Sequence, residues 1–125
     1  MNHDVLNLIK KLDKLCILSY YSINYHLRIK ITELNYFANE YYNPKDTVNS
    51  SVNFLHEIKT RIFELLGIIP HCDVSNELIF TFNDLIIEFI DEMERQEEDI
   101  SDLISAFDNM SVSFNLERGL SKIKI

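Results

Sequence analysis

The scarcity of glycine and proline is the feature that most constrains the fold of this chain. Only two glycines and two prolines occur among its 125 residues. Folds made of many short strands need tight turns at most strand ends, and these two residue types supply much of that turn chemistry. The 46% of hydrophobic residues is enough for one core. We therefore predict an all-α fold, a single-domain bundle of four to six helices that spans residues 1–125.

Apolar residues recur at steps of three and four along most of the chain, which is the spacing of a helix face. Nothing forces a break in the first helix before about Tyr25. Asp46 is the predicted N-cap of the helix after the first turn, and Asp73 or Ser75 that of the helix after the second. The apolar stripes cover Val5–Ile23, Leu27–Tyr41, Val48–Leu65 and Leu78–Met93.

Three stretches leave alternatives open. His26–Thr32 also alternates like a short strand, but the longer helical stripe around it favours a helix. The last stripe resumes over residues 100–110, so residues 75–110 form either one long helix or two, with a kink in the charged run between them. Residues 111–125 alternate weakly, which predicts a small hairpin or a frayed tail.

Negative charge is concentrated in the C-terminal part of the chain. Residues 1–70 carry 8 basic and 7 acidic side chains, a net charge of +1, whereas residues 71–125 carry 4 and 13, a net charge of −9. From Glu88 to Asp102 the acidic side chains are opposed only by Arg95. A chain this acidic is not expected to bind nucleic acid, because that affinity comes from lysine and arginine contacts to phosphates.

A helical wheel of the last helix separates an apolar side from an acidic side. Phe80 and Ile87 fall on the acidic side, which is typical of anchor residues in a binding surface. Two other interpretations remain: a solvated acidic face that keeps the chain soluble, or a central helix that buries both residues. For Phe80 burial is slightly preferred, because its acidic neighbours thin out toward the helix start. The candidate partner-binding residues are Phe80, Asp84, Ile87, Glu88, Asp91, Glu94, Glu98 and Asp102.

No pattern in the chain predicts catalysis, so we expect no catalytic residue, no metal and no cofactor. His71 and Cys72 do not supply the paired spacing of a zinc site, and no glutamate is followed by a histidine three residues later, as di-iron bundles require. Cys16 lies in an apolar helix, where a thiol is inert. The acidic run lacks the apolar enclosure that would separate two carboxyl pKa values.

The positions of the tyrosines and the absence of targeting segments lead to further predictions. All six tyrosines lie between residues 20 and 42, and packing of Tyr20, Tyr36 and Tyr41 in the bundle is preferred over a binding surface. With no secretory signal and no membrane-spanning run, the chain is expected in the cytoplasm and off the membrane. Cys16 and Cys72 are then expected as buried, reduced thiols.

These features favour binding over catalysis. The leading hypothesis is an acidic inhibitor of the immunity or antitoxin type, which neutralises a cationic toxin domain such as a nuclease. A viral or phage adaptor that binds a host protein is one alternative, and a subunit of a helical homo-oligomer is another. A helical nucleotide hydrolase that holds Mg²⁺ with its acidic run is a weaker one.

Overall fold

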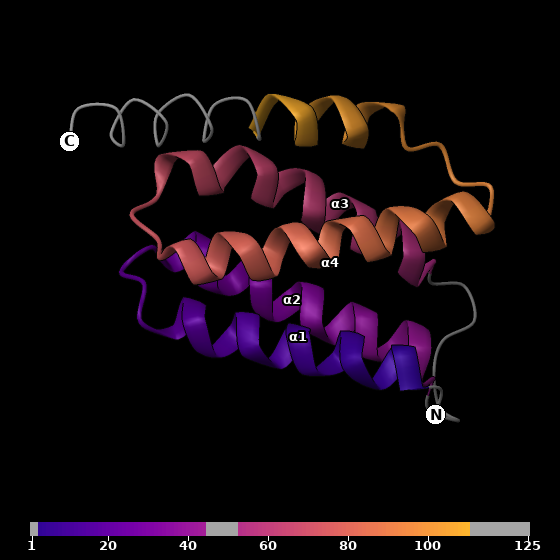
Figure 1. Ribbon diagram of the computed structural model, residues 1–125, viewed down its shortest axis with the longest axis horizontal. Coiled ribbons are helices and arrows are strands. Elements are labelled where there is room, and N and C mark those ends of the chain that lie inside the picture. The colour runs from indigo at the N-terminus through magenta and orange to yellow at the C-terminus, as the bar shows by residue number, and fades with distance from the viewer. Residues whose placement is uncertain (1–2, 45–52, 111–125) are drawn as a thin grey trace.

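The computed structural model describes residues 3–44 and 53–110 (Figure 1). Its helices are α1 (His3–Tyr20), α2 (Tyr25–Tyr42), α3 (Phe54–Ile68) and α4 (Asn76–Arg95), with a 3₁₀ turn, η1 (Ile69–His71), between the last two. Residues 101–110 are also helical. These two ranges contain no strand, which confirms the predicted all-α bundle and the helix over residues 26–32.

The helices form an antiparallel bundle. Figure 1 shows the four long helices alternating in direction along the chain. Helix α2 packs against α1 and α3, and α1 packs against α4. After α4 the chain reverses, and residues 101–110 run back alongside α3 (Figure 1). Helix α4 therefore has neighbours at its sides, while its outer side carries no further helix among the described residues.

The predicted apolar stripes supply most of the core, except that Tyr20 and Ile23 at the end of the first stripe are exposed and Val48 and Val52 of the third lie outside the described residues. The central residues of the stripes have almost no exposed surface, because each helix turns one face toward its neighbours. Burying a leucine, isoleucine or phenylalanine side chain contributes about 1.5–3 kcal/mol, so these residues dominate the stability of the bundle. The fully buried residues include Leu12, Leu15, Leu27, Ile31, Leu34, Ile58, Ile62, Leu65, Phe82 and Phe89.

Polar side chains cap three of the helices. Asn24 accepts a hydrogen bond from Leu27 N at 3.0 Å, Asn53 from His56 N at 3.1 Å and Ser75 from Leu78 N at 3.1 Å. Ser75 confirms the predicted start of α4. Two predicted boundaries are wrong. Helix α1 ends at Tyr20, and Asn24 then caps a new helix, α2. Helix α3 begins at Phe54, later than a cap at Asp46 implied. Asp46 itself lies outside the described residues.

Residues 75–110 form two helices, and a C-terminal capping motif separates them. Glu97 adopts a left-handed backbone conformation with φ of 60°. Its N–H donates to Glu94 O at 3.1 Å, and Glu98 N–H donates to Met93 O at 2.9 Å. This pair of bonds is a Schellman motif, which satisfies the last carbonyls of α4 and turns the chain away from the helix axis. The predicted hairpin or frayed tail over residues 111–125 lies outside the described residues.

Candidate protein-binding face

One stripe of side chains on α4 points away from the bundle. Its members follow one another at steps of four, three, four and three residues, so they share one face of the helix. All five are exposed, because the opposite face of α4 carries its buried residues. We call Phe80, Asp84, Ile87, Asp91 and Glu94 the outer stripe of α4.

The outer stripe combines two apolar anchors with three carboxylates. Phe80 is 67% exposed and Ile87 is 58% exposed. The preference for a buried Phe80 was therefore wrong, because no helix of the described chain covers this side of α4. Large apolar side chains that stay exposed among charged ones are typical of contact surfaces.

The other three predicted binding residues lie outside the outer stripe. Glu88 sits at the edge of α4 facing α1, where Oε1 contacts Lys11 Nζ at 3.2 Å. Glu98 follows the end of the helix and contacts Lys59 Nζ at 3.3 Å. Asp102 is on the next helix, beside α3. The prediction that Glu98 and Asp102 share one helix face with Phe80 was wrong. The helical wheel behind it treated residues 75–110 as one helix, whereas the chain reverses at residues 96–100.

One carboxylate of the acidic run is part of the interior. Glu92 is buried, accepts a hydrogen bond from Tyr41 Oη at 2.8 Å, and pairs with Arg95 at 2.7 Å. Burial and this hydrogen bond raise the pKa of Tyr41 to about 12. Burial, with the nearby charge of Glu92, also raises the pKa of Tyr42. The contacts of Glu92 with Tyr41 connect α2 to the end of α4, so Glu92 has a structural role. The carboxylates of the outer stripe are Asp84, Asp91 and Glu94.

The tyrosines divide into two groups. Tyr41 and Tyr42 are half-buried, whereas Tyr20 and Tyr36 are exposed, so the expected packing in the bundle is confirmed only for Tyr41. Four exposed tyrosines remain, and three of them gather where α1 turns into α2, together with two exposed isoleucines. We call Ile17, Tyr20, Tyr21, Ile23 and Tyr25 the tyrosine end.

The tyrosine end is a surface that the sequence reasoning missed in part. Ile23 is 100% exposed, although its spacing placed it on the apolar stripe of the first helix. The predicted stripe extended too far along the chain, because the end of the helix at Tyr20 was not predicted. The available signal was charge, since residues 15–25 contain no charged side chain.

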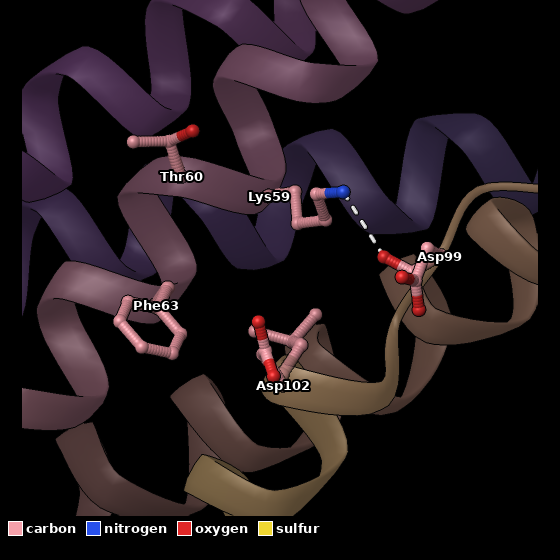
Figure 2. Close-up of a pocket in the computed structure, with 6 residues that line it drawn as sticks. Lys59, Thr60, Phe63, Asp99 and Asp102 are labelled. Atoms are coloured by element: carbon pink, nitrogen blue, oxygen red, sulfur yellow. Dashed lines mark hydrogen bonds between the residues drawn. The ribbon is translucent and has the colours of Figure 1, made fainter.

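A small pocket lies between α3 and the helix of residues 101–110. It has a volume of about 220 Å³, and Lys59, Thr60, Phe63, Asp99, Asp102 and Leu103 line it. Figure 2 shows Lys59 donating to the backbone of Asp99, at 3.0 Å. Thr60 Oγ1 donates to His56 O at 3.0 Å. The Lys59 ammonium and the Thr60 hydroxyl therefore both donate to backbone carbonyls of the chain itself.

The surroundings of the two thiols favour their protonated form. Both cysteines are free and half-buried, so the predicted burial is only partial. Burial raises the pKa of Cys16 and of Cys72, which keeps both thiols protonated near neutral pH. Asn35 donates to Cys16 Sγ at 3.3 Å, and Asn24 donates to Cys72 Sγ at 3.2 Å.

The described residues contain no group of three or more His, Cys, Asp or Glu side chains that could hold a metal ion. None of the helices in the same ranges is long and apolar enough to cross a membrane. No protein-family model, curated protein or solved structure matches this chain. A function must therefore follow from its own residues and their geometry.

Proposed function

We propose that this protein is an acidic binding module of the immunity or antitoxin type, which neutralises a cationic toxin domain by binding it through the outer stripe of α4. One observation carries the proposal: Phe80 and Ile87 are exposed on the same helix face as Asp84, Asp91 and Glu94. A solvated acidic face that serves only solubility has no need for two large apolar side chains on it.

The carboxylates and the apolar side chains have different tasks in such a complex. Opposite fields steer the partners together, and association rates then reach about 10⁸–10⁹ M⁻¹s⁻¹ at low salt. Phe80 and Ile87 act after the encounter, when burial against the partner contributes about 1.5–3 kcal/mol for each side chain. Charge therefore sets the rate of association, and the anchors set the rate of dissociation.

A nuclease toxin fits this surface best among cationic partners. A nuclease cleft that holds a phosphate backbone is lined with lysine and arginine. An acidic helix laid across such a cleft pairs with the same side chains and excludes the substrate. Inhibition by occlusion needs no chemistry from the inhibitor.

Charge reversal on the outer stripe tests the proposal. The partner is to be sought among the products of neighbouring genes as a protein with a basic domain, and the absence of such a gene would count against the proposal. Asp84→Lys with Glu94→Lys should slow association more than tenfold at low salt and flatten its dependence on ionic strength, measured by stopped flow.

The control variant carries Asp73→Lys with Asp108→Lys. It has the same net charge as the test variant, and both positions are exposed but lie outside the outer stripe. It should keep most of the association rate. Equal rates for the two double variants would contradict binding through the outer stripe, because only the net charge of the protein would then matter.

The tyrosine end supports a second candidate function, self-association. Tyrosine is enriched in interfaces because it combines a large contact area with a polar tip. The tyrosine end is also uncharged, in a chain with a net charge of −8. Two copies that met through this end would avoid the repulsion between their acidic helices.

A further inference from the structure

A shallow groove lies beside the tyrosine end, between the end of α1 and the first turns of α2. It has a volume of about 360 Å³. Tyr20 and Tyr25 belong both to the tyrosine end and to the lining of the groove, so the two form one continuous surface. The residues that line the groove are Tyr20, Tyr25, Arg28, Ile29, Thr32 and Glu33.

The groove is mainly apolar and has no net charge. Its lining contains one cation and one carboxylate, and both make contacts within the chain. The guanidinium of Arg28 lies over the ring of Tyr25, 5.6 Å from its centroid, and Glu33 Oε1 contacts Lys30 Nζ at 3.5 Å. A groove of this kind suits an aliphatic side chain better than a charged ligand.

An isoleucine projects from the same surface. Ile23 is 100% exposed in the turn between α1 and α2. Hydrogen bonds hold this turn on both sides of Ile23: Ser22 N donates to Ser19 O at 2.9 Å, and Asn24 N donates to Ser22 Oγ at 3.1 Å. Asn24 Nδ2 also donates to Cys72 Sγ at 3.2 Å, which fastens the turn to the bundle. Ile23 is therefore held in place before any partner binds, which lowers the entropy cost of binding.

Charge points to a second copy of the chain as the occupant of the groove. The chain has a net charge of −8, yet residues 15–25 contain no charged side chain. Figure 1 shows the turn between α1 and α2 at one end of the bundle and the acidic reversal at residues 96–100 at the other. Helix α4 lies between these ends and spans 20 residues, about 30 Å. Because salt screens charges over about 8 Å, two copies that meet at the tyrosine end keep their acidic ends too far apart to repel.

The exposed area is also close to what a dimer needs. The three tyrosines of the tyrosine end are 65–81% exposed, which leaves roughly 300–550 Å² of their surface in solvent. Ile17, Ile23 and Ile29 enlarge this surface further. A stable interface takes about 800 Å² from each partner, whereas a monomer rarely exposes an apolar patch of more than a few hundred Å².

We propose that two copies form a two-fold symmetric dimer in which Ile23 of each copy enters the groove of the other, between Tyr20, Tyr25 and Ile29. The inference rests on the self-association proposed above and names its contacts. A two-fold interface joins the same patch on both copies, so that patch must carry both a projection and the recess that receives it. Ile23 and the groove supply the two on neighbouring turns of the chain.

Two variants test the two sides of this contact, with the dimer dissociation constant measured by sedimentation equilibrium. Ile23→Ala shortens the projection, and Thr32→Glu places a charge in the groove that an entering isoleucine would desolvate. Each variant should weaken the dimer at least tenfold. Both positions are exposed, so circular dichroism should show unchanged helices.

Each variant has a matched control elsewhere in the bundle. Ile87→Ala shortens an exposed isoleucine on α4. Thr60→Glu changes a threonine on α3 whose hydroxyl, like that of Thr32, donates to the carbonyl oxygen four residues earlier. Both controls should keep the dissociation constant of the wild type. A control that weakens the dimer as much as its test variant would overturn the proposal.

Mixing the two defective variants tests the symmetric exchange itself. The Ile23→Ala chain keeps its groove and the Thr32→Glu chain keeps its Ile23, so a mixed dimer regains one of the two contacts, whereas neither homodimer has an intact one. With one variant carrying a fluorescent label, we expect the mixed dimer to form at least tenfold more tightly than either homodimer. A mixed dimer of intermediate affinity would overturn the exchange of Ile23 between copies.

The outcomes separate this contact from self-association in general. A dimer that Tyr21→Glu with Ile23→Glu abolishes, but that neither Ile23→Ala nor Thr32→Glu weakens, would retain self-association through the tyrosine end and overturn the Ile23 contact. A monomer at every concentration up to about 1 mM would reject both. Neither result bears on the toxin complex, which charge reversal on the outer stripe of α4 tests separately.

Discussion

At the scale of single residues, Glu97 decides the path of the C-terminal part of the chain. Its left-handed backbone allows the two hydrogen bonds that end α4. Left-handed backbone costs an ordinary L-residue about 1–2 kcal/mol, and glycine avoids this cost. The sequence offered no glycine or asparagine here, which explains why the choice between one helix and two stayed open.

Glu97→Gly should stabilise the protein by about 0.5–1 kcal/mol, because the relief of strain exceeds the entropy that glycine adds to the unfolded chain. The measurement is the urea midpoint of unfolding. Glu94→Gly removes the same charge from a helical position and should destabilise by about 0.5–1 kcal/mol. A lower midpoint for Glu97→Gly would contradict the capping motif.

At the scale of elements, α4 shows what a helical wheel can and cannot predict. The wheel placed Phe80, Asp84, Ile87, Asp91 and Glu94 together, and the structure exposes all five. A wheel describes angles about a single axis, so it carries no information on the neighbours of the helix. Lys11 and Lys14 of α1, which contact Glu88 and Glu77, were therefore not foreseen when the acidic run was matched only with Arg95.

Removing the anchors of α4 should affect dissociation from the partner. In the proposed complex with a cationic partner, Phe80→Ala with Ile87→Ala should accelerate dissociation about 10- to 100-fold and leave the association rate nearly unchanged. Because both side chains are exposed, the free energy of unfolding should change by less than about 1 kcal/mol. Surface plasmon resonance measures both rates.

The matched control for the anchors is Ile17→Ala, which removes an equally exposed isoleucine from the tyrosine end. This variant should keep the dissociation rate of the wild type. If the loss of Ile17 accelerates dissociation as much as the loss of Phe80 and Ile87, the partner contacts a different surface.

At the scale of the whole molecule, lysines from the N-terminal part of the chain pair with some of the carboxylates in the C-terminal part. The lysines of the N-terminal part reach the edges of the acidic region through Lys11–Glu88, Lys14–Glu77 and Lys59–Glu98 contacts. Such contacts on a surface contribute about 0–1 kcal/mol each. These lysines pair with carboxylates along the side of α4 and just past its end, whereas Asp84, Asp91 and Glu94 of the outer stripe stay exposed.

The tyrosine end leads to a prediction about assembly. If it joins two copies, sedimentation at rising concentration should show a monomer–dimer equilibrium, which Tyr21→Glu with Ile23→Glu abolishes by placing like charges opposite one another. Asp84→Asn should leave the equilibrium unchanged. A monomer at every concentration up to about 1 mM would reject self-association, because even weak dimers form there.

The sequence by itself determined that the chain is helical and which side of each helix is mainly apolar, because helical periodicity is local and every turn repeats it. It left the ends of α1 and α3 and the exposure of Phe80 wrong, because these depend on capping and on neighbouring helices. It could not determine which carboxylates are paired, or where Glu88, Glu98 and Asp102 lie relative to α1 and α3. Those features depend on the reversal at residues 96–100 and on the approach of α1 and α3, which bring together residues far apart in the chain. Only the tertiary structure fixes such approaches, because they follow from packing between helices.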